Sequence, residues 1–238
     1  MLSMFRGHVV AAAALVIGLA STPATADTLT YTSYSLTNAK SVTITAPISR
    51  SVSAGQIVLS GVQINSVGAA NVNAWCIDLS NTLTSTGNFN LGSISDATLA
   101  NKLNALINGV ASNSGTYPLS SGNNSAALQV AIWKAVYPSS LYAGTFQMNT
   151  GVTNGADIDT LSNTFLANVN NSTWNKNSSM QLVTLDPNTQ NGNQRLITLV
   201  PGSPPNNNTN TPEPASMALL AVGLAAIGVA RRRRRTLH

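Results

Sequence analysis

Two kinds of hydrophobic periodicity divide the middle of the chain. Six stretches, in which apolar and polar residues alternate or β-branched residues cluster, predict strands at about 28–34, 41–46, 56–65, 72–79, 180–185 and 194–200. Between the fourth and fifth stretches the apolar spacing lengthens to that of a helix. Because strands precede and follow this helical block, we expect an α+β domain, either a β-sandwich or a barrel with a helical insertion.

Within the helical block, apolar residues recur every three or four positions over three segments, at about 96–110, 126–137 and 156–169. Residues that commonly begin and end helices mark two of these segments. Asp96 precedes the first as an N-cap, and Gly109 lies near its expected end. Asn124 or Ser125 is suited to cap the second, and Pro138 should stop it.

The two ends of the chain have the pattern of export signals. Residues 1–26 combine Arg6, an apolar run and an Ala-Thr-Ala sequence, which predicts a signal peptide cut by signal peptidase before Asp27. Residues 215–230 are uncharged. As a helix they would span roughly 24 Å against a bilayer core of about 30 Å. Arginines that reach toward the headgroups can make up the difference, so we expect a membrane anchor before processing.

Charged and proline residues flank this apolar segment. Pro212, Glu213 and Pro214 precede it, and five arginines follow it: Arg231, Arg232, Arg233, Arg234 and Arg235. Pro-Glu-Pro, an apolar helix and an Arg cluster, in this order at the C-terminus, resemble the PEP-CTERM sorting signal. The resemblance implies processing by an exosortase-type membrane protease or transpeptidase, in a Gram-negative bacterium that makes extracellular polysaccharide. An ordinary single-span anchor is the alternative.

Between these ends lies one body of domain size. We expect a signal peptide at 1–26, an extracellular domain at 27–200, a Pro/Asn-rich linker at 201–211 and the sorting signal at 212–238. A domain of this length buries roughly 70% of the surface that its unfolded chain exposes. With either kind of C-terminal anchor, the body would lie outside the cytoplasmic membrane, on the cell surface or in a biofilm matrix.

The formal charge of +5 lies at the ends of the chain. Within the body six basic residues balance six acidic ones: Lys40, Arg50, Lys102, Lys134, Lys176 and Arg195 against Asp27, Asp78, Asp96, Asp157, Asp159 and Asp186. We therefore expect no nucleic-acid partner. Both histidines, His8 and His238, lie in the terminal segments, so the body cannot use an imidazole for catalysis. We expect neither a metal nor another cofactor.

Two residues do not fit an ordinary core. Cys76 is the single cysteine of an exported chain, so it cannot form an internal disulfide. Strand alternation places Cys76 and Asp78 on one face and Trp75 on the other. Gln129 lies on the apolar stripe of the second helix, one turn before Trp133. Burying an unpaired amide costs about 2 kcal/mol or more, so Gln129 alone indicates a rim position or a satisfied hydrogen bond.

The sequence Trp-Cys-Ile-Asp, followed at a distance by Leu-Gln-Val-Ala-Ile-Trp, resembles the internal Cys-Gln thioester domains of bacterial surface proteins. The resemblance implies that Cys76 supplies the thiol and Gln129 the acyl group. Their thioester would acylate an amine or hydroxyl on a surface protein or polysaccharide. Trp75 and Trp133 are large enough to shield the bond from water, and Asp78 is the available proton relay.

Two other hypotheses stay open. A non-enzymatic matrix protein would keep the Cys-Gln pair packed, or use it as a structural staple, and bind its partners noncovalently. An exported enzyme would need a carboxylate pair, either Asp157 with Asp159 or Asp78 with Asp186. Acids two positions apart at a helix start commonly satisfy the helix dipole instead. We therefore expect a covalent adhesin and not an enzyme.

Overall fold

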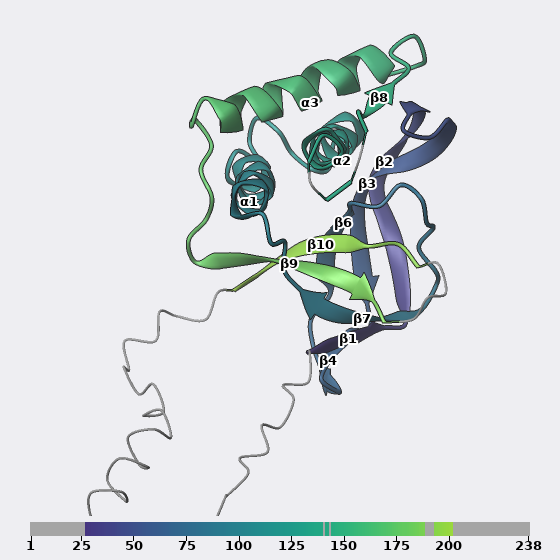
Figure 1. Cartoon of the computed structure of the whole chain (residues 1–238), viewed down its shortest axis with the longest axis vertical. Coiled ribbons are helices and arrows are strands. Elements are labelled where there is room, and N and C mark those ends of the chain that lie inside the picture. Colours follow the sequence, from purple (N-terminus) through teal and green to yellow (C-terminus); the bar gives the residue numbers. More distant parts are fainter. Residues whose placement is uncertain (1–26, 140, 143, 189–192, 202–238) are drawn as a thin grey trace, which may run out of the picture.

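The computed structural model describes residues 27–139, 141–142, 144–188 and 193–201 (Figure 1). The expected signal peptide and sorting signal lie outside the described residues, as does the expected linker apart from Pro201, which still pairs with Met180. Within the described part of the chain, no helix has both the length and the apolar character needed to cross a bilayer.

Ten strands form one antiparallel sheet in the order β5-β4-β1-β7-β9-β10-β6-β3-β2-β8. They are β1 (Thr28–Tyr31), β2 (Ser33–Ala46), β3 (Arg50–Ser60), β4 (Gln63–Ile64), β5 (Val67–Gly68), β6 (Val72–Cys76), β7 (Gly87–Gly92), β8 (Gln147–Met148), β9 (Met180–Pro187) and β10 (Leu196–Pro201). The strands that we expected to form a sandwich or barrel thus belong to one hydrogen-bonded sheet. In Figure 1, β2 and β3 run across the direction of β7 and β9, so the sheet is strongly twisted.

Comparison with the predicted strands shows where the sequence pattern was incomplete. The predicted strand at 56–65 is broken at Gly61, which has a positive φ of 61° and separates β3 from β4. The strand predicted at 72–79 ends at Cys76. The pattern missed β7, a Gly- and Asn-rich strand in which Phe89 is the only fully buried residue, and also the two-residue strands β5 and β8.

The three predicted helices are confirmed as α1 (Ala97–Ser112), α2 (Gly122–Val136) and α3 (Gly155–Asn170). Asp96 caps α1 as predicted, because its carboxylate accepts hydrogen bonds from two N–H groups of the first turn. Helix α2 ends just before Pro138, also as predicted. Its N-cap is Ser121, so the prediction of Asn124 or Ser125 was wrong.

Gly109 has a different role from the expected one. It does not end α1, which continues to Ser112. A Cβ atom at Gly109 would lie only 2.4 Å from the ring of Trp174. The glycine therefore lets Trp174 pack directly on the helix backbone, and its position in the sequence reflects packing and not termination.

Helix α2 lies at the centre of the helical layer, between α1 and α3 and above the sheet (Figure 1). From Asn124 to Val136 every residue except Lys134 is buried. Lys134 is directed to α3, where its ammonium contacts the Asp159 carboxylate at 2.7 Å. A helix that is apolar on nearly all sides has to be surrounded by other elements, and α2 contacts both other helices and strands β2, β3 and β6.

A bulge in β2 prepares the surface that receives α2. The register of β2 with β3 shifts between Thr37 and Lys40. Asn38 takes a positive φ of 53° within this bulge. On the opposite strand, a Cβ atom at Gly55 would lie 2.8 Å from the Cα of Ala39, so only glycine allows this close approach. The bulge interrupts the ladder locally and leaves backbone groups to be satisfied from outside the sheet.

Ser125 of α2 satisfies two of these backbone groups. Its fully buried hydroxyl accepts a hydrogen bond from the N–H of Gln56 at 3.0 Å and donates one to the carbonyl of Thr37 at 3.2 Å. Ser125 lies one helical turn before Gln129, on the same side of α2. The contact therefore fixes the position of the helix against the sheet close to the candidate site.

Replacing Ser125 with alanine should lower the free energy of unfolding by about 1 kcal/mol, because it leaves the partly buried N–H of Gln56 and carbonyl of Thr37 without this partner. Urea unfolding of the two proteins measures the difference as a shift of the midpoint. Ser121→Ala is the matched control, since the Ser121 side chain makes no capping hydrogen bond. Equal midpoints for the Ser125 and Ser121 variants would contradict this role of the hydroxyl.

Candidate functional site

Cys76 is the last residue of β6 and is 4% exposed. On one side it pairs with Leu196 of β10. On the other side β6 pairs with β3 only as far as Ala74, so the sheet offers Cys76 no further strand there. Its backbone N–H and carbonyl therefore need other partners, because buried backbone groups are almost always hydrogen-bonded.

The side chain of Gln129 supplies both partners. The backbone N–H of Cys76 donates to Oε1 of Gln129 at 3.0 Å, and Nε2 of Gln129 donates to the carbonyl oxygen of Cys76 at 2.7 Å. Gln129 is 1% exposed, so the structure places this amide in the core with its hydrogen bonds satisfied. The two residues that we predicted to react are thus in direct contact across a sequence separation of 53 positions.

The thiol of Cys76 is oriented by the chain that follows it. Sγ donates a hydrogen bond to the backbone carbonyl of Asp78 at 2.8 Å. Burial raises the pKa of this thiol well above its usual range, and the positive charge of Arg50 and the indole of Trp133 only partly oppose the shift. Trp133 Nε1 nevertheless makes no hydrogen bond of normal geometry. The thiol therefore stays protonated at neutral pH.

Asp78 lies next to the thiol through its backbone and not through its carboxylate. The carboxylate oxygens accept hydrogen bonds from the N–H of Ser80 at 2.7 Å and from Nδ2 of Asn81 at 2.5 Å. This arrangement caps the turn after β6. The carbonyl of Asp78 also accepts from Nε2 of Gln194 at 2.9 Å, which ties the turn to the segment before β10.

Tyr137, just beyond the C-terminal end of α2, holds the same turn from another direction. Its hydroxyl accepts a hydrogen bond from the N–H of Leu79 at 2.9 Å, and its ring stacks on Tyr142 with centroids 5.3 Å apart. Burial raises the pKa of Tyr137 to about 12, so the hydroxyl stays neutral under physiological conditions. Gln129 of α2 and Tyr137 just after it thus hydrogen-bond to the segment from Cys76 to Leu79 at its first and last residues.

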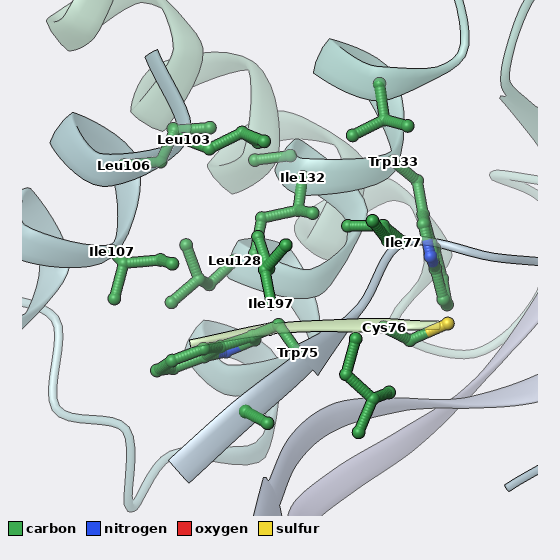
Figure 2. Close-up of a cluster of buried hydrophobic side chains, with 14 of the residues drawn as sticks. Trp75, Cys76, Ile77, Leu103, Leu106, Ile107, Leu128, Ile132, Trp133 and Ile197 are labelled. Carbon is green, nitrogen blue, oxygen red and sulfur yellow. The ribbon is translucent and has the colours of Figure 1, made fainter. Parts of the chain in front are cut away.

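Cys76, Gln129 and Trp133 line one cavity of about 310 Å³. Figure 2 shows the Cys76 sulfur beside the ring of Trp133, whereas the ring of Trp75 extends away from the sulfur. Trp75 lines a separate cavity together with Ile107. Of the two tryptophans expected to shield the pair, the structure therefore brings only Trp133 to the site.

The other carboxylates are engaged elsewhere. Asp159 pairs with Lys134, and Asp186 pairs with Arg195. Asp157 lies in the first turn of α3 and is exposed. None of these three carboxylates lines the cavity beside Cys76. In the described ranges, the structure contains no group of three or more His, Cys, Asp or Glu side chains arranged to hold a metal ion.

Several residues of the site were not identified from the sequence. Tyr137 could have been, because it lies two helical turns after Gln129 and continues the stripe that contains Trp133. Arg50 and Gln194 line the cavity from distant parts of the chain, and no local pattern marks either of them. Their placement depends on the pairing of strands that lie far apart in sequence.

Comparison with known proteins assigns the C-terminal end of the chain. Residues 210–235 match the PEP-CTERM protein-sorting motif. This confirms the resemblance of Pro212 to Arg235 to that signal, and it indicates export, processing by an exosortase-type system and sorting to the cell surface. No curated protein matches the chain.

Three solved structures that align with this chain are N-terminal domains of bacterial surface proteins. The first is from the Streptococcus pyogenes pilus tip adhesin Cpa (TM-score 0.42, 13% identity, covering 74% of this chain and 94% of that one). The second is the N-terminal thioester domain of a Clostridium perfringens surface protein (TM-score 0.42, 11% identity, covering 73% of this chain and 99% of that one). The third is the N-terminal thioester domain of the S. pyogenes fibronectin-binding protein SfbI (TM-score 0.41, 17% identity, covering 72% of this chain and 91% of that one). The chain carries a PEP-CTERM sorting motif at residues 210–235, and its structural neighbours include thioester domains of bacterial surface proteins.

Proposed function

We propose that the body forms an internal thioester between Sγ of Cys76 and Cδ of Gln129, and that this bond serves for covalent adhesion at the cell surface or in the extracellular matrix. The observation that carries the proposal is the buried pairing of the Gln129 amide with the backbone of Cys76, in a cavity that the thiol also lines. The sorting motif supports the location outside the cell.

The hydrogen bonds at the site suit the first step of this chemistry. The N–H of Cys76 donates to the carbonyl oxygen of Gln129, so it polarises the carbonyl and would stabilise negative charge on that oxygen when sulfur attacks. The Cys76 carbonyl holds Nε2, the atom that leaves. A C–S bond forms and a C–N bond breaks. The thiol proton joins the departing NH₂ group, so that one ammonia is released.

The second step transfers the acyl group to a partner. An amine or hydroxyl on a surface protein or polysaccharide attacks Cδ of Gln129, the C–S bond breaks, and the nucleophile's proton restores the Cys76 thiol. The ring of Trp133, held by stacking on Phe146 at 5.7 Å, covers the sulfur and would limit hydrolysis before a partner docks. Each chain forms one bond and is not regenerated, so the protein acts as a covalent adhesin without enzymatic turnover.

The depth of burial favours a second candidate, a structural staple. Cys76 and Gln129 are 4% and 1% exposed. By analogy with disulfides, a bond that closes a loop of about 54 residues stabilises a fold by roughly 4 kcal/mol. In this version a matrix protein binds its partners noncovalently and the linked pair resists small nucleophiles. Reaction with an added amine separates the two candidates.

Incubation of the mature protein with methylamine should add one methylamine to the acyl carbon of Gln129 and free the thiol of Cys76. Intact mass and peptide mapping measure this addition. Cys76→Ser should abolish it, because a serine hydroxyl at this position is a much poorer nucleophile toward an amide than a thiol. Thr82→Ala, a change in the same cavity that touches neither reacting atom, should leave it intact.

Two results would contradict covalent adhesion. A thioester that survives prolonged exposure to methylamine would favour the staple. A thiol that reacts with iodoacetamide in fresh protein as soon as the chain is unfolded, before any amine is added, would show that the bond never formed. In the native state an unreacted thiol should stay unlabelled at neutral pH, since burial raises its pKa.

Deleting residues 212–238 should change the location of the protein, because the segment carries the sorting motif and the expected anchor. Cell fractionation and immunoblotting measure the distribution, and mass analysis of the surface form should show that Arg231 to Arg235 have been removed. Substituting the five arginines with lysine keeps the positive charge and serves as the matched control, because it tests whether charge alone holds the segment in the membrane. Intact arginines on surface-retained protein would favour the plain anchor.

A further inference from the structure

The cavity beside Cys76 contains one charged side chain, that of Arg50. The other residues that line it are apolar or neutral. Arg50 begins β3, where its partner in β2 is Ile44, so the neighbouring strand offers it no carboxylate. The two ion pairs of the described residues, Lys134 with Asp159 and Arg195 with Asp186, do not involve it. Arg50 therefore lines the cavity without an acidic neighbour in the lining and without an ion pair in the described part of the chain.

Two donors that line this cavity are buried without a hydrogen-bond partner in the described chain. They are Nε of Arg50 and Nε1 of Trp133, and Trp133 is only 2% exposed. Leaving a buried donor unsatisfied is costly, particularly on a charged group, so such atoms in a native structure call for an explanation. The indole of Trp133 lies beside the Cys76 sulfur, which accounts for its orientation. The unsatisfied Nε of Arg50 has no such neighbour among the described residues and points to an acceptor that is supplied from outside.

Arg50 lies in the cavity that the two reacting residues, Cys76 and Gln129, line. Burial raises the pKa of the Cys76 thiol, the nearby Asp78 carboxylate raises it further, and the positive charge of Arg50 lowers it by a smaller amount. A ligand anion bound by Arg50 would therefore occupy the cavity that Gln129 also lines. An arginine fork matches the two oxygens of a carboxylate.

The remaining lining of the cavity fits a sugar. Neutral hydrogen-bonding side chains, suited to hydroxyl groups, are Ser51, Ser53, Asn81, Thr82 and Gln194. Tyr34 and Leu36 add apolar surface, and Leu36 is 42% exposed, one of three large hydrophobic residues exposed in the described ranges. A ring with one apolar face, several hydroxyls and a carboxylate uses all three kinds of surface.

On the basis of the proposed function, we propose that this cavity recognises an acidic sugar, whose carboxylate binds Arg50 while a neighbouring hydroxyl attacks the acyl carbon of Gln129. An ester bond forms between the sugar oxygen and Cδ, the C–S bond breaks, and the hydroxyl proton moves to the sulfur of Cys76. The partner is accordingly a polysaccharide that contains uronic acids.

Methyl glucuronide and methyl glucoside test this assignment, since they differ in the carboxylate and share the other hydroxyls. Intact mass of the mature protein measures ester formation at equal probe concentrations. The glucuronide should react about tenfold faster, as expected for a charge-assisted contact, and the advantage should shrink as salt is added. Within the Arg50→Gln variant, the glucuronide rate divided by the methylamine rate should fall about tenfold, whereas the methyl glucoside rate divided by the methylamine rate should stay as in the wild type. Arg50→Lys keeps the positive charge and loses the two-pronged guanidinium, so its rate with methyl glucuronide should lie between those of the wild type and Arg50→Gln.

Acetate gives a measurement that needs no variant, because it should compete with methyl glucuronide in the wild-type protein and leave methyl glucoside unaffected. Equal rates for the two glycosides, insensitive to acetate and to Arg50→Gln, would overturn the acidic-sugar site while methylamine addition still supported the thioester. A faster, Arg50-dependent reaction with an acidic lysine-containing peptide would make the partner a protein instead. If methylamine never adds, the proposed function fails. Calorimetry of methyl glucuronide with the Cys76→Ser variant then still decides whether the cavity binds the sugar. Binding that is present in Cys76→Ser and lost when Arg50→Gln is added would support the site.

Discussion

The amide of Gln129 has to find hydrogen bonds inside an apolar core, and it finds them on the backbone of Cys76. This is possible because β3 stops pairing with β6 at Ala74 and leaves the last residue of the strand open on one side. Each group therefore satisfies the other, and separating them would leave four buried polar atoms without partners. The position of α2 against the sheet, and with it the shape of the cavity, depends on this pairing.

Two further contacts of α2 fix the same geometry. Ser125 docks the helix into the bulge of β2 one turn before Gln129, and Tyr137 holds the N–H of Leu79 two turns after it. These three polar contacts, made by α2 and its C-cap residue, set the rotation and the translation of the helix against the sheet. Rigid placement of this kind is what a reaction between a thiol and an unactivated amide requires, because reacting atoms held in an attack-ready pose avoid most of the entropic cost of meeting.

Much of this architecture could be predicted from local sequence. The apolar spacing predicted three helices, Asp96 and Pro138 marked two of their ends, and the resemblance to thioester domains predicted that Cys76 and Gln129 lie together, which the structure shows. What could not be predicted depends on partners far away in the chain. The bulge of β2 requires Gly55 on another strand, and Arg50 and Gln194 reach the cavity only after the strands have paired. Asp78 looked like a proton relay because alternation places it beside Cys76, yet its carboxylate caps the following turn.

The same chain carries a surface-sorting motif and a buried, hydrogen-bonded pair of Cys76 and Gln129, and the proposed function is a covalent bond between these two side chains. The central claim of this proposal concerns the mass of the protein as the cell makes it. High-resolution mass spectrometry of freshly isolated mature protein, kept free of amines and analysed with Cys76→Ser alongside, measures that claim directly. The account predicts a wild-type chain lighter than its processed sequence by one ammonia, and a variant at its full calculated mass. A wild-type chain at full mass would contradict it.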